Sequence, residues 1–312
     1  MAYTTIDDPT SFFNTVLYTG NGTTDHAITG VGFQPDWTWL KKRSNADDHI
    51  LQDVVRTATK YLISNSNAAE ATYAEGFKSF DSDGFTLGNA NNTNQNTHTF
   101  ASWNWKGGTT SGLSGGNITP SAYSYDATSG FGVYKYTGNG SADQTIPHGL
   151  GAIPQLIFYK RLDSSTNWVV QSNLLGNRDQ LVLNGTDAEN TDSRLSDSDN
   201  WTSTFFKVGS YGDMNNNGSN HVAYVFCNVK GYCKVGTYTG GSDPFVYLGF
   251  KPAWIMFKNT SSAENWRIVD NKRDTDNPVV QHLFSNSTSA EASGTSYSDF
   301  IHFLSNGFKI IS

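Results

Sequence analysis

Hydrophobic and polar positions repeat along the chain in the same order three times. Each copy opens with a strand-like stretch that ends in Tyr-Thr-Gly, at residues 18–20, 136–138 and 238–240. A run that is apolar at nearly every position follows, at residues 37–41, 156–160 and 254–258. Such a run predicts a strand buried on both faces, because a strand with one wet face alternates apolar and polar residues. The copies lie roughly 100 residues apart, too long for a solenoid or propeller unit, which indicates repeated domains.

The later elements of each copy recur as well. A second strand is predicted at residues 50–53, 168–171 and 266–270, and a third at residues 61–63, 181–183 and 283–284. Residues 51–62 have helical spacing in the first copy alone, so a loop with at most one helical turn is expected between these strands. Asp83-Gly84 and Asn306-Gly307, each between apolar runs, predict a hairpin. A closing strand is expected at residues 100–105 and 222–226, whereas the third copy reaches Ser312 before its counterpart.

This pattern predicts an all-β fold of tandem antiparallel β-sandwich modules, of jelly-roll or lectin-like type, with the third module incomplete. The predicted organisation is an N-terminal extension (residues 1–11), unit one (12–108), a Gly/Ser-rich flexible or extended linker (109–130), unit two (131–230) and unit three (232–312). Sheets rarely tolerate an open edge. The edge of unit three is therefore expected to be covered by a neighbouring subunit or by residues beyond Ser312.

Composition supports this fold class. Charged residues make up 16% of the chain, aromatic residues 13%, and Gly numbers 30. Turn formers that alternate with aromatic and β-branched runs favour strands, and the aromatic content argues against a disordered chain. Cys227 and Cys233 are too few for a disulfide framework or a zinc site. They are interpreted as reduced thiols, with a bridge between them as the alternative.

The formal net charge of −7 argues against a nucleic-acid partner, because phosphate binding requires clustered Lys and Arg. The sequence has no run of about 18 apolar residues, so no membrane insertion by a helix is expected. No signal peptide is visible at the start. These features predict a protein that is made in a cytoplasm and leaves it, if at all, by lysis or by a dedicated route.

A search for catalytic groups yields no consistent set. Residues 112–116 match the hydrolase pattern G-x-S-x-G, but that pattern requires a strand leading into a helix, and here it lies in the linker. Asp81-Ser82-Asp83-Gly84 suggests calcium, yet it lacks the other ligands of a calcium loop, so a plain turn is favoured. The seven histidines are scattered without metal-ligand spacing. No catalytic residue, metal or other cofactor is expected, and the chain is not expected to be an enzyme.

Charged residues also recur at matched positions. A glutamate follows Ala in each copy, at Glu70, Glu189 and Glu291, which favours a shared structural hydrogen bond. An Asp and an Arg share a three-residue offset in two copies, Asp53 with Arg56 and Asp270 with Arg273. This offset predicts an ion pair that fixes the geometry between strand and loop, worth about 1 kcal/mol or less if it is exposed.

Tryptophan suggests a carbohydrate site, because aromatic faces stack on the C–H faces of sugars. Four Trp residues occupy positions that are apolar in every copy and are expected in the core: Trp37, Trp39, Trp254 and Trp266. The other four are less constrained and free to be exposed. They are the candidate ligand-binding residues: Trp103, Trp105, Trp168 and Trp201.

Four segments form a distinctive set: Thr5-Ile6-Asp7-Asp8-Pro9, the Tyr-Thr-Gly-Asn-Gly turn at residues 18–22, Gly-Phe-x-Pro-Asp-Trp at residues 32–37, and residues 79–88. Together they resemble uncharacterised repeat proteins of marine tailed bacteriophages. The resemblance covers nearly the whole chain and is strongest in unit one. Those proteins are regarded as virion components, often tail fibre or tail proteins, and the resemblance transfers no catalytic residue.

The resemblance and the repeats together imply a non-enzymatic virion protein, best described as a homotrimeric tail fibre or adhesin that presents loops to a host surface glycan. Multiple weak sites gain by avidity, which suits such a binder. The expected partners are other virion proteins, further copies of the chain and a host surface polysaccharide. The alternative is a capsid decoration or other structural virion protein without glycan recognition. A polysaccharide-degrading enzyme would need paired carboxylates in one cleft.

Overall fold

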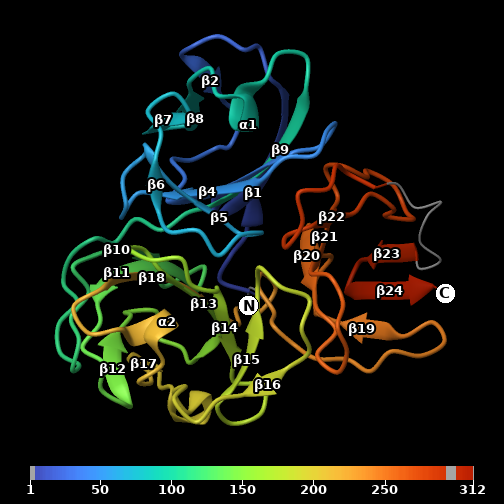
Figure 1. Ribbon diagram of the computed structural model, residues 1–312. Coiled ribbons are helices and arrows are strands. Elements are labelled where there is room, and N and C mark those ends of the chain that lie inside the picture. Colours follow the sequence, from blue (N-terminus) through green and yellow to red (C-terminus); the bar gives the residue numbers. More distant parts are fainter. Residues whose placement is uncertain (1–3, 293–299, 312) are drawn as a thin grey trace.

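The computed structural model of the protein describes residues 4–292 and 300–311. The first three residues of the expected N-terminal extension and Ser312 therefore lie outside the described residues. The fold is almost entirely β, built from antiparallel sheets. Three lobes surround a common centre, and they correspond to units one, two and three in chain order (Figure 1).

Unit one is a sandwich of two antiparallel sheets. Its main sheet has the order β1 (Phe13–Thr19), β9 (Thr99–Trp105), β3 (Trp37–Lys42), β4 (His49–Asp53), β5 (Lys60–Ile63) and β6 (Ala71–Thr72). Its small sheet has the order β2 (His26–Ile28), β8 (Gly84–Leu87) and β7 (Phe77–Asp81). A short helix, α1 (Asn91–Asn94), leads from the small sheet back to β9, and a 3₁₀ turn at Pro9–Ser11 precedes β1.

Unit two repeats this plan with one strand added and one lost. Its main sheet has the order β10 (Ala122–Asp126), β11 (Phe131–Thr137), β18 (Asn220–Cys227), β13 (Pro154–Arg161), β14 (Val169–Ser172), β15 (Asp179–Val182) and β16 (Asn190–Thr191). The small sheet pairs β12 (Gln144–Pro147) with β17 (Phe205–Val208). A loop with a 3₁₀ turn at Ser198–Asn200 precedes β17, and α2 (Gly212–Asn215) corresponds to α1.

Unit three contains two sheets of three strands. One has the order β20 (Trp254–Phe257), β21 (Arg267–Asp270) and β22 (Leu283–Phe284). The other has the order β19 (Phe245–Tyr247), β24 (Gly307–Ile311) and β23 (Phe300–Leu304). Within the described residues, no strand of unit three corresponds to β9 or β18, as the sequence predicts.

The apolar runs form β3 and β13, which lie inside the main sheets of units one and two, and β20, which lies at the end of its sheet in unit three. Every residue of β3 is buried. Trp37 and Trp39 point to one face and belong to a cluster shared with the other units. Leu40 points to the opposite face and packs in the sandwich core of unit one. The prediction of a strand covered on both faces is therefore confirmed for β3, whereas the four residues of β20 are half-buried.

The core has one shared part and three local parts. The shared cluster takes residues from the main sheets of all three units, including Trp37, Tyr224 and Trp266. Each local cluster lies between the main and small sheets of one unit. The main sheet of each unit thus serves as one layer of its own sandwich and as one wall of the common centre.

The connection at residues 109–130 is more ordered than a flexible or extended linker. Its second half contains β10, which pairs with β11 from Ala122 opposite Lys135 to Asp126 opposite Phe131. Ile118 is buried in the core of unit two. Small residues predict flexibility when they lack partners, but Tyr123 and Tyr125 in this segment give it apolar surface to bury against Tyr134.

Helices are confined to single turns in the described residues. None of them is long and apolar enough to cross a membrane.

Candidate functional site

The four tryptophans that were candidates for ligand binding all lie inside the protein. Their exposed fractions are 0% for Trp103, 6% for Trp105, 0% for Trp168 and 3% for Trp201. The expected exposure of these side chains is wrong. Trp103, Trp105 and Trp168 are buried in the cluster shared between the units, and Trp201 is buried in the local core of unit two. A buried ring offers no face to a sugar, so a glycan site on this protein must use other residues.

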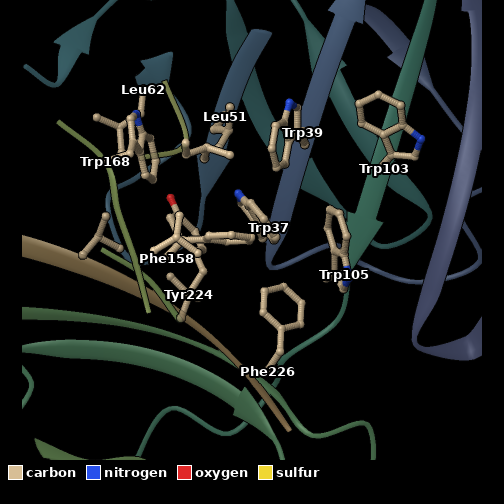
Figure 2. Close-up of a cluster of buried hydrophobic side chains, with 14 of the residues drawn as sticks. Trp37, Trp39, Leu51, Leu62, Trp103, Trp105, Phe158, Trp168, Tyr224 and Phe226 are labelled. Atoms are coloured by element: carbon tan, nitrogen blue, oxygen red, sulfur yellow. The ribbon is translucent and has the colours of Figure 1, made fainter. Parts of the chain in front are cut away.

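Three of these tryptophans build the common centre, where rings from different units stack. Trp37 of unit one lies 4.3 Å from Trp105 and 4.4 Å from Tyr224 of unit two between ring centroids, and both pairs are stacked. Trp254 of unit three meets Trp105 edge-on at 5.6 Å. Figure 2 shows this cluster, with Trp37 and Trp105 facing the rings of Tyr224 and Phe226. The core role predicted for Trp37, Trp39 and Trp266 is confirmed, and Trp254 packs half-buried against the same cluster.

The lysine at the end of each apolar run forms a hydrogen bond to a neighbouring unit. The ammonium of this lysine donates to a backbone carbonyl three residues before the recurring glutamate of a neighbouring unit. The distances are 3.0 Å from Lys41 to Thr288, 3.2 Å from Lys160 to Asn67 and 3.0 Å from Lys258 to Thr186. Burial lowers the pKa of Lys41 and of Lys160 to about 8, because the charged form loses hydration there.

The recurring glutamates take part in the same three interfaces. The backbone N–H of each donates to the carbonyl two residues after the lysine, at 2.9 Å (Glu70 to Leu162), 2.8 Å (Glu189 to Thr260) and 2.9 Å (Glu291 to Arg43). These backbone bonds run between units. The glutamate side chains accept hydrogen bonds within their own units, from Arg56 Nη1 at 3.3 Å (Glu70), the Gly176 N–H at 2.9 Å (Glu189) and Arg273 Nη1 at 3.0 Å (Glu291), which confirms the predicted structural hydrogen bond. Unit one is joined to unit two, unit two to unit three, and unit three to unit one, so the three units close into a ring.

Indole groups provide a further link at two of the interfaces. Trp168 Nε1 donates to the carbonyl of Ile63 at 2.9 Å, and Trp266 Nε1 donates to that of Val182 at 2.9 Å. His49 occupies the same place in unit one, and its Nδ1 accepts a hydrogen bond from Trp39 Nε1 at 2.9 Å. The candidate residue Trp168 thus has a structural part to play in joining units one and two.

The predicted Asp–Arg ion pairs exist, and both are buried at the common centre. Arg56 Nε lies 2.6 Å from Asp53 Oδ2, and Arg273 Nε lies 2.6 Å from Asp270 Oδ2, with all four side chains fully buried. A closing strand of another unit completes each pair. Tyr224 Oη donates to Asp53 at 2.6 Å, and Trp103 Nε1 donates to Asp270 at 3.0 Å.

The third position of this kind is filled differently. Ser172 of β14 stands where β4 has Asp53, since the two strands share one place in their sheets. It donates through its hydroxyl to the carbonyl of Gln155 at 2.6 Å. The unit that would complete this position is unit three, which has no closing strand among its described residues. The acid is therefore absent at the one interface where no side-chain donor is available for it.

The repeated Tyr-Thr-Gly turn has a structural explanation. In unit one the Tyr18 hydroxyl donates to the carbonyl of Thr93 in α1 at 2.7 Å. Asn94 at the end of α1 accepts from the backbone N–H of Asn21 at 2.9 Å and donates to Thr23 and Gly88 carbonyls at 2.8 Å. A Cβ at Gly20 would lie 2.2 Å from the carbonyl oxygen of Gln95, so only glycine fits there. Unit two repeats these contacts through Tyr136, Gly138 and Asn215.

The acidic turn at residues 81–84 is a plain turn between β7 and β8, as expected. Asp83 accepts hydrogen bonds from the backbone N–H groups of Gly32 and Gly30 at 2.6 and 3.1 Å, which lower the pKa of its carboxyl. Asp81 accepts from the hydroxyls of Ser79 and Thr86 at 2.8 and 2.7 Å. Across the described residues, no three His, Cys, Asp or Glu side chains are grouped so that they could hold a metal ion.

The remaining sequence candidates are structural. Residues 112–116 lie in a loop that no helix follows, so the hydrolase pattern has none of its required context. Cys227 and Cys233 are both free thiols, as interpreted, and burial raises the pKa of each to about 12. A polar cavity of about 140 Å³ in unit three is lined by Lys251, Asn271, Asp274 and five neighbouring residues, well below the several hundred Å³ usual for small-molecule pockets.

Exposed aromatic residues gather instead on β19 of unit three. Phe245 and Tyr247 are 48% and 56% exposed, and they share one face of the strand because side chains alternate. The register places Val246 opposite Phe308, as Ile28 stands opposite Phe85 in unit one. The positions of Phe245 and Tyr247 therefore correspond to Ala27 and Thr29. The signal for this pair was present in the sequence, as aromatic residues that appear in one copy at places where the others have small or polar ones.

Comparison with known proteins identifies the family of the chain. No curated protein and no solved structure is similar to this chain. Residues 8–312 match a domain of unknown function, DUF7483, which spans all three units. Because the match extends over nearly the whole sequence, the chain belongs to the DUF7483 family.

Proposed function

We propose that the protein is a non-enzymatic structural component of a bacteriophage virion, of the tail-fibre or adhesin type, that binds a host surface glycan. The virion assignment rests on the resemblance carried by residues 5–9, 18–22, 32–37 and 79–88. The observation that carries glycan binding is the exposed aromatic pair of Phe245 and Tyr247 on β19.

The use of the recurring polar residues supports a binding role over catalysis. Residues that repeat in all copies would be the natural carriers of a shared activity. Here Lys41, Glu70 and their counterparts make contacts between units, and the repeated Asp–Arg pairs are buried at the centre. Their function is to hold the scaffold together, which leaves recognition to side chains that vary between the copies.

Phe245 and Tyr247 have the chemistry of a sugar platform. Aromatic rings bury large areas of apolar surface at a small cost in side-chain entropy, and the tyrosine hydroxyl adds a polar group. The loop at 238–243 before β19 contains Thr, Gly, Ser and Asp, which supply adaptable polar contacts. A sugar ring that stacks on this pair would have hydrogen-bonding groups within reach of that loop.

Binding to polysaccharide extracted from the host cell surface tests the proposal. We expect the intact protein to bind, and the double substitution Phe245→Ala with Tyr247→Ala to weaken binding by about tenfold or more, as for aromatic anchors in other interfaces. Tyr73→Ala provides the matched control, since Tyr73 is 46% exposed on unit one. Equal loss in the control and the double variant, or shortened polysaccharide chains after incubation, would contradict the proposal.

The alternative function is a capsid decoration or other structural virion protein without glycan recognition. Within the described residues β20 pairs only with β21, and this favours the alternative because an unpaired strand edge can pair with another chain. Labelling the protein on purified virions separates the two. Label at the tail favours the adhesin, and label over the head lattice favours the decoration protein. The oligomeric state in solution, measured by light scattering, tests the proposed homotrimer.

A further inference from the structure

Strand β20 of unit three has an open edge. Its counterparts β3 and β13 each lie between two strands, β9 and β4 in unit one and β18 and β14 in unit two. Within the described residues, β20 pairs only with β21. All four residues of β20 are half-buried, whereas every residue of β3 is buried. The difference lies on the side where a closing strand stands in the other two units.

The opposite wall of this gap is also present. Residues 233–240 are the counterpart of β1 and β11, which flank the closing strand on its other edge. Tyr238 keeps the place of Tyr18. Its ring lies 5.9 Å from that of Phe308, and the Tyr18 ring lies 6.4 Å from that of Phe85. Tyr238 thus keeps its packing against the small sheet. The place beside the unpaired edge of β20, which β9 and β18 occupy in the other two units, is called the slot here.

Gly240 gives an independent sign of a missing occupant. A Cβ at Gly20 would lie 2.2 Å from the Gln95 carbonyl oxygen, and one at Gly138 would lie 2.5 Å from that of Asn216. Both clashes arise because the helical turn before the closing strand docks against the glycine. A Cβ at Gly240 would meet nothing within 4 Å in the described structure. The glycine is present where only a docked helical turn would require it.

We propose that this slot binds an extended segment of a partner polypeptide, made of one helical turn followed by a strand that runs antiparallel to β20. Such strand addition pairs the free N–H and C=O groups of β20 and seats alternate side chains in pockets. On one face of the inserted strand the pockets belong to the common centre, where Trp105 and Phe13 already contact Trp254. Those positions therefore favour aromatic or large aliphatic residues, as in β9 and β18.

One position of the partner strand has a different requirement. The residue opposite Met256 corresponds to Trp103 and Tyr224, which donate hydrogen bonds to buried Asp side chains. The slot in unit three faces Ser172 at that level instead of an acid. The partner residue there can be apolar, because no buried carboxylate requires a donor.

A second copy of this chain does not fit the slot as well as a separate partner segment. Strands β9 and β18 are each hydrogen-bonded on both edges within their own sheets. Donating either would dismantle the sheet that it came from. Edge-to-edge pairing of two β20 strands would place a whole sheet beside β20, whereas in units one and two a single closing strand stands between β1 and β3 or between β11 and β13.

Synthetic peptides test the proposal directly. The probes are labelled copies of residues 91–105 and 212–227, which contain the helical turn and closing strand of units one and two. Fluorescence anisotropy with the full chain is expected to show saturable binding, and amide exchange at residues 254–257 is expected to slow when peptide is bound. A peptide with Ala101→Pro is the control, since proline removes a donor from the middle of the ladder. No saturable binding up to about 1 mM peptide, the weak end of specific association, would overturn the proposal.

Two glycine variants locate the binding. Gly240→Ala places a methyl group where the helical turn must approach, and it is expected to weaken peptide binding by about tenfold or more. Gly241→Ala changes a neighbouring glycine that also has nothing within 4 Å, and binding is expected to change by less than about twofold. Both variants are expected to fold, because a Cβ at either position would meet nothing within 4 Å. Equal effects of the two variants, or self-association of the chain that protects residues 254–257 without peptide, would overturn the proposal.

Discussion

Arg56 shows how a charge is kept inside this protein. Besides its 2.6 Å contact with Asp53, its guanidinium reaches the Leu51 carbonyl at 3.1 Å and both Tyr224 Oη and Glu70 at 3.3 Å. Burial opposes the charged form, but Asp53, Tyr224 and Glu70 outweigh it and raise the pKa of Arg56. The charge is therefore retained by contacts from two different units.

Removing this side chain is expected to be costly. Arg56→Ala would leave Asp53 buried without its counter-ion, which typically lowers the free energy of unfolding by about 3–5 kcal/mol. Arg161→Ala is the control, because Arg161 pairs with Asp163 in a partly exposed position and such pairs contribute about 1 kcal/mol or less. Urea denaturation measures both. Similar losses of unfolding free energy in the two variants would show that the buried pair stabilises the protein no more than the partly exposed one.

His221 gives the protein a dependence on acid pH. Its Nδ1 contacts the carbonyl of Ser219 at 3.0 Å, and its ring stacks on Tyr136 at 5.4 Å between centroids. Burial lowers the pKa of His221 from 6.5 to about 4. Between these two values the unfolded chain binds more protons than the folded one, so stability is lost as the pH falls through this window.

The corresponding residue in unit one is Phe100, as the strand registers show, so His221→Phe is the natural test. The variant cannot take up a proton at this position, and it is expected to lose less stability between pH 7 and pH 4, by up to about 3 kcal/mol. His148, whose pKa burial also lowers, remains in both proteins. Unfolding free energies at several pH values supply the comparison. Equal slopes for the two proteins would exclude His221 as a source of acid sensitivity.

At the scale of elements, the single-turn helices link the two sheets of a unit through side-chain hydrogen bonds. Asn215 in α2 repeats the contacts of Asn94, accepting from Asn139 N–H at 2.9 Å and donating to the carbonyls of Ser141 and Gly209 at 2.8 Å. The amide side chain thus joins the Tyr-Thr-Gly turn to the last strand of the small sheet. A helix of four residues has little stability of its own, so tertiary contacts determine it.

Asn94→Ala is expected to lower the free energy of unfolding by about 2 kcal/mol or more, because the buried carbonyl of Gly88 and the partly buried backbone groups of Asn21 and Thr23 would lose their partner. Asn91→Ala is the matched control in the same helix. Asn91 is exposed, and its substitution is expected to change stability by about 0.5 kcal/mol or less. Thermal or urea unfolding distinguishes them. A loss at Asn94 as small as that at Asn91 would show that the Tyr-Thr-Gly turn does not depend on the Asn94 side chain.

The sequence predicted those elements whose signal is local or repeated. The buried strands β3 and β13, the hairpins at residues 80–87 and 303–310 and the lack of a long helix all followed from patterns within a few residues. Helices α1 and α2 were missed, since a helix of four residues is too short to show hydrophobic periodicity. Strand β10 was missed because small residues dominate the segment at 109–130 that contains it, and such residues are typical of a linker.

The candidate site was harder to predict, because burial between units is not encoded in any one segment. Trp103 and Trp105 sit on a strand whose two faces are both covered, one by its own small sheet and one by the other units. A single repeat viewed alone has one face that appears free to solvent. The matched Lys and Glu positions were visible in sequence, but only the closed arrangement reveals that each pair spans an interface.

At the scale of the whole molecule, the shared cluster couples the three units. The main sheets of all three contribute to it, so no unit buries its own inner face without the others. The folding free energy of each unit therefore depends on the presence of its neighbours. This differs from independent domains joined by linkers, which unfold separately.

The full chain is expected to unfold in one cooperative transition. Tryptophan fluorescence and far-ultraviolet circular dichroism should give the same urea midpoint, because Trp37, Trp105 and Trp254 report on the common centre and the dichroism reports on all strands. A fragment of residues 12–108 should fail to fold stably, since the rings of the shared cluster would face water. Separate transitions for the units, or a stable fragment, would contradict this expectation.

The ring of contacts also constrains how this family can change in length. In a linear array of repeats, an extra copy stacks on the last one and the chain grows. Here the last unit returns to the first through Glu291 and Arg43, so a fourth copy would have to break that closure to enter. Gene duplication cannot extend such a protein into a filament, and insertions are tolerated only where chain segments leave the ring, in the loops at the outer rim.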